Sequence, residues 1–200
     1  MTYISLFPTT VLKSSLGRDL TAKEVNFLSS INKVVESTGN YTSYNKNILD
    51  SPEIKNLKVH LNKKLHQYIA EVYKPKEKIT SYITQSWMNI TDPGRWHHKH
   101  THYNSFLSGV FYLSVDNNED KIFFYKDDYP QIYIESKEWT LNNSRQWFLD
   151  VSPLDVIIFP SNLIHDVQTT TSNSPRISIA FNSFITGTLG DYHSATELKL

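Results

Sequence analysis

The chain changes character near Ile79, where helical periodicity gives way to short β-branched and aromatic runs separated by turn residues. Short strands repeated at close spacing are typical of an all-β sandwich or a double-sheet jelly roll. About eight strands are expected, over residues 79–90, 106–115, 121–125, 131–134, 145–149, 155–159, 164–168 and 176–185. We therefore predict a mainly β protein with flanking helices, built on a jelly roll, the double-stranded β-helix.

Two helices are predicted before this region, and we expect them to pack outside the sheets. Thr21 and Glu24 form a capping box ahead of apolar residues at helical spacing, which predicts a helix over 22–36. A second helix should begin at an Asp-Ser-Pro cap near residue 50 and end near residue 74. Its apolar stripe is formed by Ile54, Leu57, Leu61, Leu65, Tyr68 and Val72.

The rest of the chain is expected to connect these elements within one domain. Residues 39–47 should form a polar loop between the two helices. The predicted parts are a helical region over about 1–77, a jelly-roll core over about 78–186 and a loosely ordered tail over 187–200. One hydrophobic core is expected at a length of 200 residues.

Charge and cysteine content narrow the function classes. Lysine plus arginine and aspartate plus glutamate number 20 each, so we expect no nucleic-acid partner and no anionic membrane surface. The absence of cysteine excludes disulfides, thiolate metal ligands and a thiol nucleophile. The sequence has neither a secretory leader pattern nor an apolar run of membrane-spanning length. We expect a cytoplasmic protein, acting in the host cytoplasm if a virus encodes it.

Four of the eight histidines lie within residues 96–102, a density that calls for a chemical reason. His100 and His102 are two residues apart, so on an extended chain they point to the same side. His165 follows a distant apolar strand and can complete one face of a metal's coordination sphere. We predict a metal site of these three residues, and we prefer His102 to His98 for its position relative to the following strand.

Arg176 supplies what a bare metal site lacks, a fixed two-pronged anchor for a carboxylate. A strong turn over 170–175 precedes it, which predicts that Arg176 lies on the strand next to that of His165. Arg176 and Ser178 share one face of an extended strand and can clamp a carboxylate together. The pattern therefore indicates iron with an acid cosubstrate.

At this point the sequence resembles the 2-oxoglutarate- and iron(II)-dependent oxygenases of bacteria and marine phages. The segments that carry the resemblance are 86–90 (SWMNI), 100–105 (HTHYNS), 108–113 (SGVFYL), 159–167 (FPSNLIHDV) and 176–182 (RISIAFN). The resemblance implies a cupin-like double-stranded β-helix that holds Fe(II). It also implies that 2-oxoglutarate chelates the iron, while Arg176, assisted by Ser178, grips its far carboxylate. From its place beside Trp87 on the strand before the histidine cluster, Asn89 is expected to touch the metal-side carboxylate.

The same resemblance implies a reaction. 2-Oxoglutarate and dioxygen would be cosubstrates, 2-oxoglutarate would be decarboxylated to succinate, and an unknown prime substrate would be hydroxylated. A prolyl or other protein side chain is the first expectation for that substrate, because prolyl hydroxylases are of similar size. Ascorbate as an added cofactor and a homodimer as the assembly stay open.

One departure from the wider superfamily concerns the second ligand. An aspartate or glutamate usually follows two residues after the first histidine, where this chain has His102. Without that carboxylate the metal keeps one more positive charge, which favours binding of the 2-oxoglutarate dianion but weakens later charge neutralisation. Asn104 or a water is the alternative third ligand if His102 turns away.

Two other functions fit parts of the pattern. Gly94 with His100-x-His102, and Pro160-x-Asn162-x-x-His165, resemble the cupin signature, although the cupin glutamate is missing. A three-histidine cupin would need no 2-oxoglutarate, so the two readings separate on whether Arg176 lines the pocket. A non-catalytic binding or virion-associated jelly-roll domain is the third possibility, because fold alone does not define function.

Aromatic residues near the histidine cluster fit either a core or a substrate pocket. They are Trp87, Trp96, Tyr103, Phe111 and Tyr112. A peptide groove and a small-molecule pocket therefore both stay open for the prime substrate.

Overall fold

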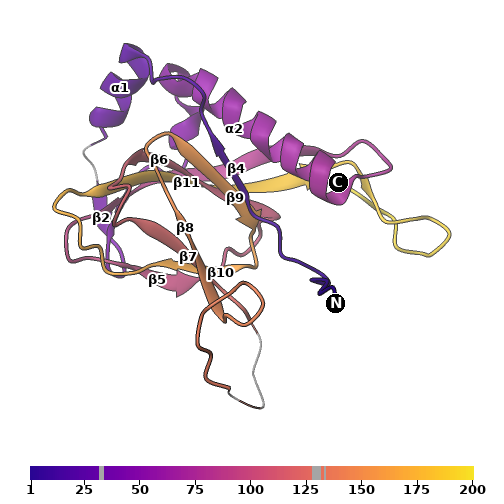
Figure 1. Ribbon diagram of the computed structural model, residues 1–200. Coiled ribbons are helices and arrows are strands. Elements are labelled where there is room, and N and C mark those ends of the chain that lie inside the picture. The colour runs from indigo at the N-terminus through magenta and orange to yellow at the C-terminus, as the bar shows by residue number, and fades with distance from the viewer. Residues whose placement is uncertain (32–33, 128–131, 133) are drawn as a thin grey trace.

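The computed structural model describes residues 1–31, 34–127, 132 and 134–200. Two antiparallel sheets face each other, and helices cover the outer face of the larger one (Figure 1). In these ranges the major sheet has the order β1 (Leu12–Ser15), β9 (Asp155–Pro160), β6 (Leu107–Ser114), β11 (Arg176–Thr186), β4 (Thr80–Thr91), β3 (Tyr41–Ser43) and β2 (Val34–Glu36). The minor sheet has the order β5 (His97–His100), β10 (Ile164–Val167), β7 (Lys121–Tyr125) and β8 (Gln146–Asp150). The predicted double-stranded β-helix is confirmed.

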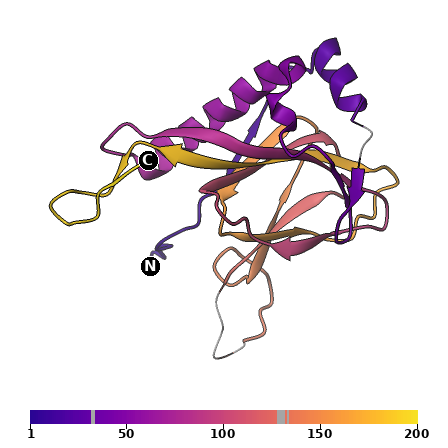
Figure 2. The ribbon, with the colours of Figure 1, turned by 180° about the vertical axis from the view of Figure 1, so that it is seen from behind.

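The helices lie before β4 in the chain, although β1, β2 and β3 of the major sheet also lie in this region, which was expected to be helical over about 1–77. The helical elements are α1 (Ala22–Ser29), the 3₁₀ turns η1 (Ile48–Asp50) and η2 (Pro52–Ile54), α2 (Lys55–Tyr68) and a π-helical turn, η3 (Ile69–Tyr73). The capping box is present, because the Glu24 backbone N–H donates to the Thr21 hydroxyl and the Thr21 backbone N–H donates to the Glu24 carboxylate. Both helices lie on the same side of the major sheet, as the view from behind also shows (Figure 2).

Two apolar layers hold these parts together. The first lies between α2 and the outer face of the major sheet, where Leu57, Leu61 and Leu65 are fully buried in one cluster with Phe111 and Phe181. The second lies between the two sheets, and its buried members are Tyr112, Ile122, Phe124, Val151, Ile157 and Phe159. Two members of this layer, Tyr112 and Ile122, also line a polar cavity between the sheets.

Gly109 is required where β6 passes β11. It pairs with Phe181 across the two strands, and the Phe181 ring lies over it. A Cβ atom at residue 109 would lie 2.2 Å from the ring, well inside van der Waals contact. The glycine thus lets a large aromatic ring fill the layer beneath the helices.

Several expectations about the helical region were wrong. The first helix ends at Ser29, and residues 34–36 form β2 rather than its last turn. The expected polar loop over 39–47 contains β3, which pairs with β4. Val72 is exposed, because the stripe turns away from the sheet where α2 passes into the π-helical turn.

The strand predictions were closer, with β1 and β5 missed. Residues 131 and 133 of the strand expected over 131–134 lie outside the described residues, and Ile132 and Ile134 are exposed and in no strand. The tail expected to be loose contains a short ladder, β12 (Thr188–Leu189) with β13 (Leu198–Lys199).

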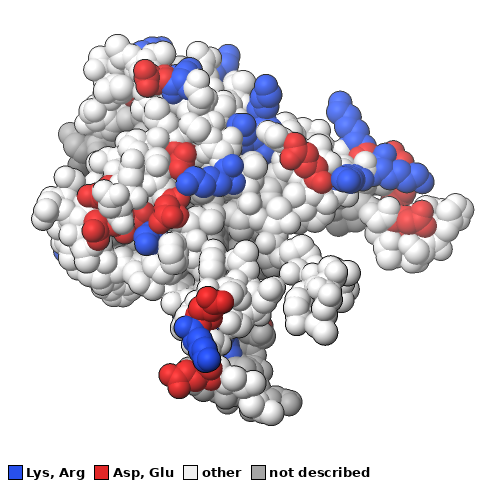
Figure 3. Space-filling model, viewed as in Figure 1, with Lys and Arg blue, Asp and Glu red and all other residues white. Residues whose placement is uncertain are grey.

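On the face shown in Figure 3, basic and acidic side chains lie interspersed among a mostly uncharged surface. Over the described parts of the chain, no helix combines the length and apolar character needed to cross a membrane.

Candidate metal centre

His100 and His165 face each other across neighbouring strands of the minor sheet. They are paired in the β5–β10 register, and their ring centroids lie 4.3 Å apart. Nδ1 of His100 donates to the carbonyl of His98 at 2.7 Å, and Nδ1 of His165 donates to the carbonyl of Leu163 at 2.9 Å. Because a carbonyl only accepts, each ring keeps its lone pair on Nε2, the arrangement expected of a metal ligand.

His102 lies two residues beyond β5 and turns toward the other two rings. Its Nε2 is 3.2 Å from Nε2 of His165, and the three histidines have ligand atoms that all lie within 4.8 Å of one another. Two nitrogens about 2.1 Å from one ion, in adjacent coordination positions, are about 3 Å apart. The donor set therefore fits a divalent ion. Asn104, the alternative ligand, is exposed and belongs to neither histidine group.

A buried polar network holds the segment that carries His102. The His102 backbone N–H donates to the carbonyl of Ser161 at 2.9 Å. The Ser161 hydroxyl lies 2.8 Å from the hydroxyls of both Ser105 and Ser108, and Ser108 donates to Asn182 at 3.0 Å. This network joins the turn after β5 to β6, β9 and β11, so the position of His102 is fixed by the major sheet.

Burial keeps these imidazoles neutral. It is the largest cause that lowers the pKa of His102 to about 4 and of His97 to about 3, and the neighbouring histidines lower both further. Burial also lowers the pKa of His100 and, well below its ordinary value, that of His165. Neutral imidazole is the form that binds metal, so the cluster is ready to bind an ion at neutral pH.

Arg176 faces this cluster from the opposite sheet. It was expected on a strand adjacent to that of His165, which was wrong: the turn over 170–175 crosses from β10 in the minor sheet to β11 in the major sheet. Arg176 is only 3% exposed. Its guanidinium donates to the carbonyl of Lys121 at 2.5 Å and to the hydroxyl of Tyr112 at 3.3 Å.

A polar row crosses the major sheet beside Arg176. Ser178 on β11 is paired with Asn89 on β4 and with Tyr112 on β6, and all three line the cavity together with Arg176 and the histidines. Burial raises the pKa of Tyr112 to about 12, so its hydroxyl stays protonated. Oδ1 of Asn89 is buried and has no hydrogen-bond partner among the described residues, which is unusual unless a ligand supplies one.

Tyr112 and His97 line the cavity but were not assigned a site role from the sequence. Tyr112 was considered only as one of several aromatic residues, although it shares a face of β6 with the cavity residue Val110. His97 was noted only as one of the four histidines within residues 96–102. Four residues of β5, His97 to His100, span the same length as three residues of β10, His165 to Val167, so β5 contains a β-bulge.

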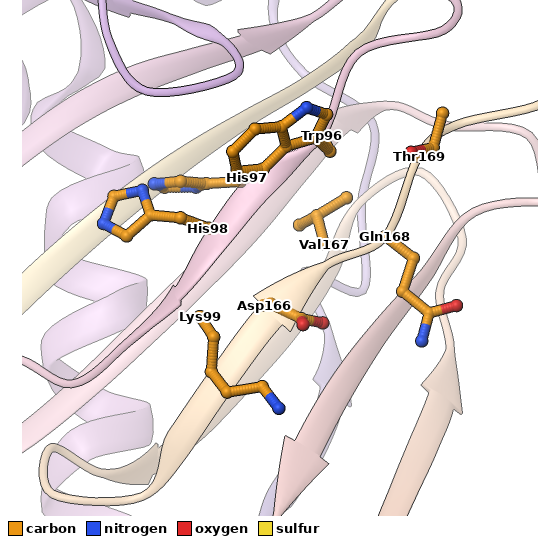
Figure 4. Close-up of a pocket in the computed structure, with 8 residues that line it drawn as sticks. All are labelled: Trp96, His97, His98, Lys99, Asp166, Val167, Gln168 and Thr169. Carbon is orange, nitrogen blue, oxygen red and sulfur yellow. The ribbon is translucent and has the colours of Figure 1, made fainter.

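The bulge changes which histidines share a face. Figure 4 shows His97 and His98 projecting to the same side of β5, with Lys99 on the other side. In a regular strand His97 would point away from His100. Here their ring centroids are 4.6 Å apart, and His97 lines the cavity with the other three rings.

The five aromatic residues divide between pocket and core. Trp87 and Tyr112 line the cavity, and the Trp87 ring lies 5.8 Å from the ring of His102. Trp96 lines an outer groove beside β5, Phe111 is buried beneath the helices, and Tyr103 is exposed. Part of the aromatic cluster is therefore placed to contact a substrate.

The fold and the donor set are those expected of a metalloprotein of the double-stranded β-helix class: His100 and His165 lie on the minor sheet, His102 lies just beyond β5, and a buried arginine lies on the major sheet. Residues 85–182 match the family described as "Putative 2OG-Fe(II) oxygenase". This part of the chain, which holds the whole site, belongs to that family, and the protein is a 2-oxoglutarate- and iron(II)-dependent oxygenase. No curated protein sequence matches the chain.

Solved structures of low sequence identity share the fold. A 2OG-Fe(II) oxygenase family oxidoreductase from Burkholderia pseudomallei is 10% identical, with a TM-score of 0.57 over 86% of this chain and 83% of that one. HygX from Streptomyces hygroscopicus, with nickel, 2-oxoglutarate and hygromycin B bound, is 12% identical, with a TM-score of 0.59 over 88% and 82%. A Pseudomonas putida prolyl-4-hydroxylase is 12% identical, with a TM-score of 0.54 over 88% and 94%.

Proposed function

We propose that His100, His102 and His165 hold the iron and that Arg176 anchors the far carboxylate of 2-oxoglutarate. The observation that carries this proposal is the placement of a buried guanidinium and three convergent imidazoles on opposite walls of one cavity. When bound, the iron supplies the oxidising chemistry and offers open positions to the oxoacid and dioxygen. The residues of the chain bind and orient the oxoacid.

The polar residues beside Arg176 are suited to bind the two ends of 2-oxoglutarate. Arg176 and Tyr112 are already hydrogen-bonded, so together they present several donors to a carboxylate without further rearrangement. Ser178 lies between Tyr112 and Asn89 and can donate to the same carboxylate. Asn89, whose buried amide oxygen has no described partner, is assigned to the metal-side end of the oxoacid.

The low pKa of the histidines supports this assignment. A protonated imidazole cannot bind iron, and burial holds the histidine pKa values well below neutral pH. Replacement of the usual carboxylate by His102 leaves the site without a negative protein ligand, which increases its attraction for the dianionic oxoacid. The positive charge of Arg176 on the facing wall also attracts the dianionic oxoacid.

Arg176 also separates this function from a three-histidine cupin. A cupin of that kind needs no anchored oxoacid, yet Arg176 is buried beside the cavity and joined to Tyr112, which also lines it. A buried charge without a ligand-binding role is costly. The geometry therefore favours the oxygenase that uses 2-oxoglutarate.

For the prime substrate we propose a protein side chain, with proline first, that is hydroxylated beside Trp87. The likeness in fold to a prolyl-4-hydroxylase of similar length supports this choice. Trp87 offers a flat apolar wall next to His102, on which a pyrrolidine ring can pack. Mass spectrometry of proline-containing peptides after reaction would detect the gain of one oxygen atom.

Succinate release tests the core of the proposal. Protein incubated with Fe(II), 2-oxoglutarate and air should release succinate even without the prime substrate, because slow uncoupled turnover is expected. His165→Gln should abolish the release, whereas His193→Gln, at an exposed histidine far along the chain, should not change it. Metal and oxoacid binding without any succinate would contradict the proposed activity.

A further inference from the structure

The bulge in β5 brings together a second group of three histidines. Among the residues that the structure describes, His97, His98 and His100 form a group whose ligand atoms all lie within 4.8 Å of one another. It has His100 in common with the proposed iron site. Nδ1 of His98 is buried and has no hydrogen-bond partner among these residues, as expected of a nitrogen that awaits a ligand.

The second group lies nearer to solvent than the first. His97 and His98 line an outer groove beside β5, whose other wall is formed by residues 166–169 after His165 (Figure 4). His102 and His165 line only the inner cavity between the sheets. An ion arriving from the groove therefore meets His98 before it meets the inner histidines.

His100 cannot serve both groups at once. Its Nδ1 donates to the carbonyl of His98 at 2.7 Å, so Nε2 is the one ring nitrogen left to bind an ion. An imidazole nitrogen binds one divalent ion at a time. Occupation of either group must therefore remove a ligand from the other.

We propose that His97, His98 and His100 form a second metal position, which takes a zinc-class divalent ion and excludes metal from the inner site. Three imidazoles and one water complete the tetrahedral shell that zinc prefers, and the open groove supplies the water. Iron with 2-oxoglutarate instead needs the inner cavity, where Arg176 lies. Zinc thus withdraws His100 from the oxygenase centre.

Three variants test this proposal through metal binding alone. His102→Gln/His165→Gln leaves the outer group complete, His97→Gln/His98→Gln leaves the inner group complete, and His100→Gln removes a ligand from both. Glutamine has a similar size and no charge, and thermal melts identify any variant that fails to fold. Zinc binding is measured by equilibrium dialysis without oxygen.

The wild type and both double variants should bind one equivalent of zinc each. His100→Gln should bind zinc roughly 100-fold more weakly or worse, since even the loss of a residue behind a ligand costs up to about that factor. With cobalt(II) in place of zinc, 2-oxoglutarate should change the absorption spectrum of His97→Gln/His98→Gln. It should not change that of His102→Gln/His165→Gln.

Two results would overturn the proposal. If folded His102→Gln/His165→Gln binds zinc no better than His100→Gln, the outer position does not exist. If the wild type binds two equivalents, the groups do not compete for His100. Should His102→Gln/His165→Gln prove unfolded, the wild type is compared with His97→Gln/His98→Gln, and an equal zinc affinity of the two would overturn the proposal. Failure here does not contradict the proposed iron site, because succinate release examines that site separately.

Discussion

Replacing Arg176 by alanine should weaken the binding of 2-oxoglutarate far more than it weakens the binding of metal. Arg176 is 3% exposed, and its guanidinium is held by the hydroxyl of Tyr112 and by the carbonyl of Lys121. Loss of one partner of a buried charge pair costs about 2–5 kcal/mol. That range corresponds to an increase of about 30-fold to 5,000-fold in the dissociation constant.

Milder substitutions show which property of Arg176 and its partner Tyr112 is needed to bind 2-oxoglutarate. Arg176→Lys keeps the charge but loses the planar fork, and it should fall between alanine and wild type. Tyr112→Phe removes one hydroxyl and should cost about 0.5–1.5 kcal/mol. Arg95→Ala is the matched control, because Arg95 forms an exposed ion pair with Glu36 and lies outside the inner cavity.

The assay is calorimetric titration of 2-oxoglutarate into manganese-loaded protein without oxygen. Metal affinity and the thermal midpoint of each variant are measured in parallel, since Arg176→Ala also removes the hydrogen bond to Lys121. An oxoacid affinity within about threefold of wild type, in a folded Arg176→Ala protein that binds metal normally, would refute the role of Arg176.

Three further results are expected. Ser108→Ala should lower the free energy of unfolding by about 1–3 kcal/mol and weaken metal binding, because Ser161 and Asn182 in the buried network that holds His102 lose a hydrogen-bond partner. Chemical denaturation measures the stability and equilibrium dialysis measures the metal affinity. An unchanged metal affinity would show that this network does not position His102. Leu61→Ala should lower the free energy of unfolding by about 2–5 kcal/mol and leave the 2-oxoglutarate affinity unchanged, since Leu61 is fully buried between α2 and the major sheet. A smaller loss would show that neighbouring side chains move into the cavity left by the substitution. In metal-free protein the unfolding free energy should fall as the pH drops from 6.5 toward 4, because the unfolded histidines take up protons there and His97 and His102 do not. The slope is at most about 1.4 kcal/mol per pH unit for each histidine, and His102→Gln should make it shallower in urea titrations.

The strand pattern and the grouping of His100, His102 and His165 could be predicted from the sequence because both follow local rules. Short β-branched and aromatic runs predicted β6 and β11, and the spacing of His100 and His102 predicted that both side chains lie on the same side of the chain, where the structure also places His165. Arg176 and Ser178 were correctly assigned to one face of β11, and both line the cavity. These properties depend on a period of two along a single strand.

What the sequence could not provide depends on how strands pair. The bulge that turns His97 inward depends on the register between β5 and β10, and the residue types in β5 do not predict it. Likewise, the sequence of the turn over 170–175 does not show whether the turn connects adjacent strands of one sheet or crosses from one sheet to the other. Residues 34–36 have an apolar spacing that suits a helix, but pairing with β3 makes them a strand.

β11 lies between β6 and β4, and without it the major sheet is two separate pieces. It also carries Arg176, so the same strand both unites the sheet and brings the proposed carboxylate anchor to the cavity. A nascent chain that has been synthesised only as far as His165 therefore still lacks a closed cavity around its histidines.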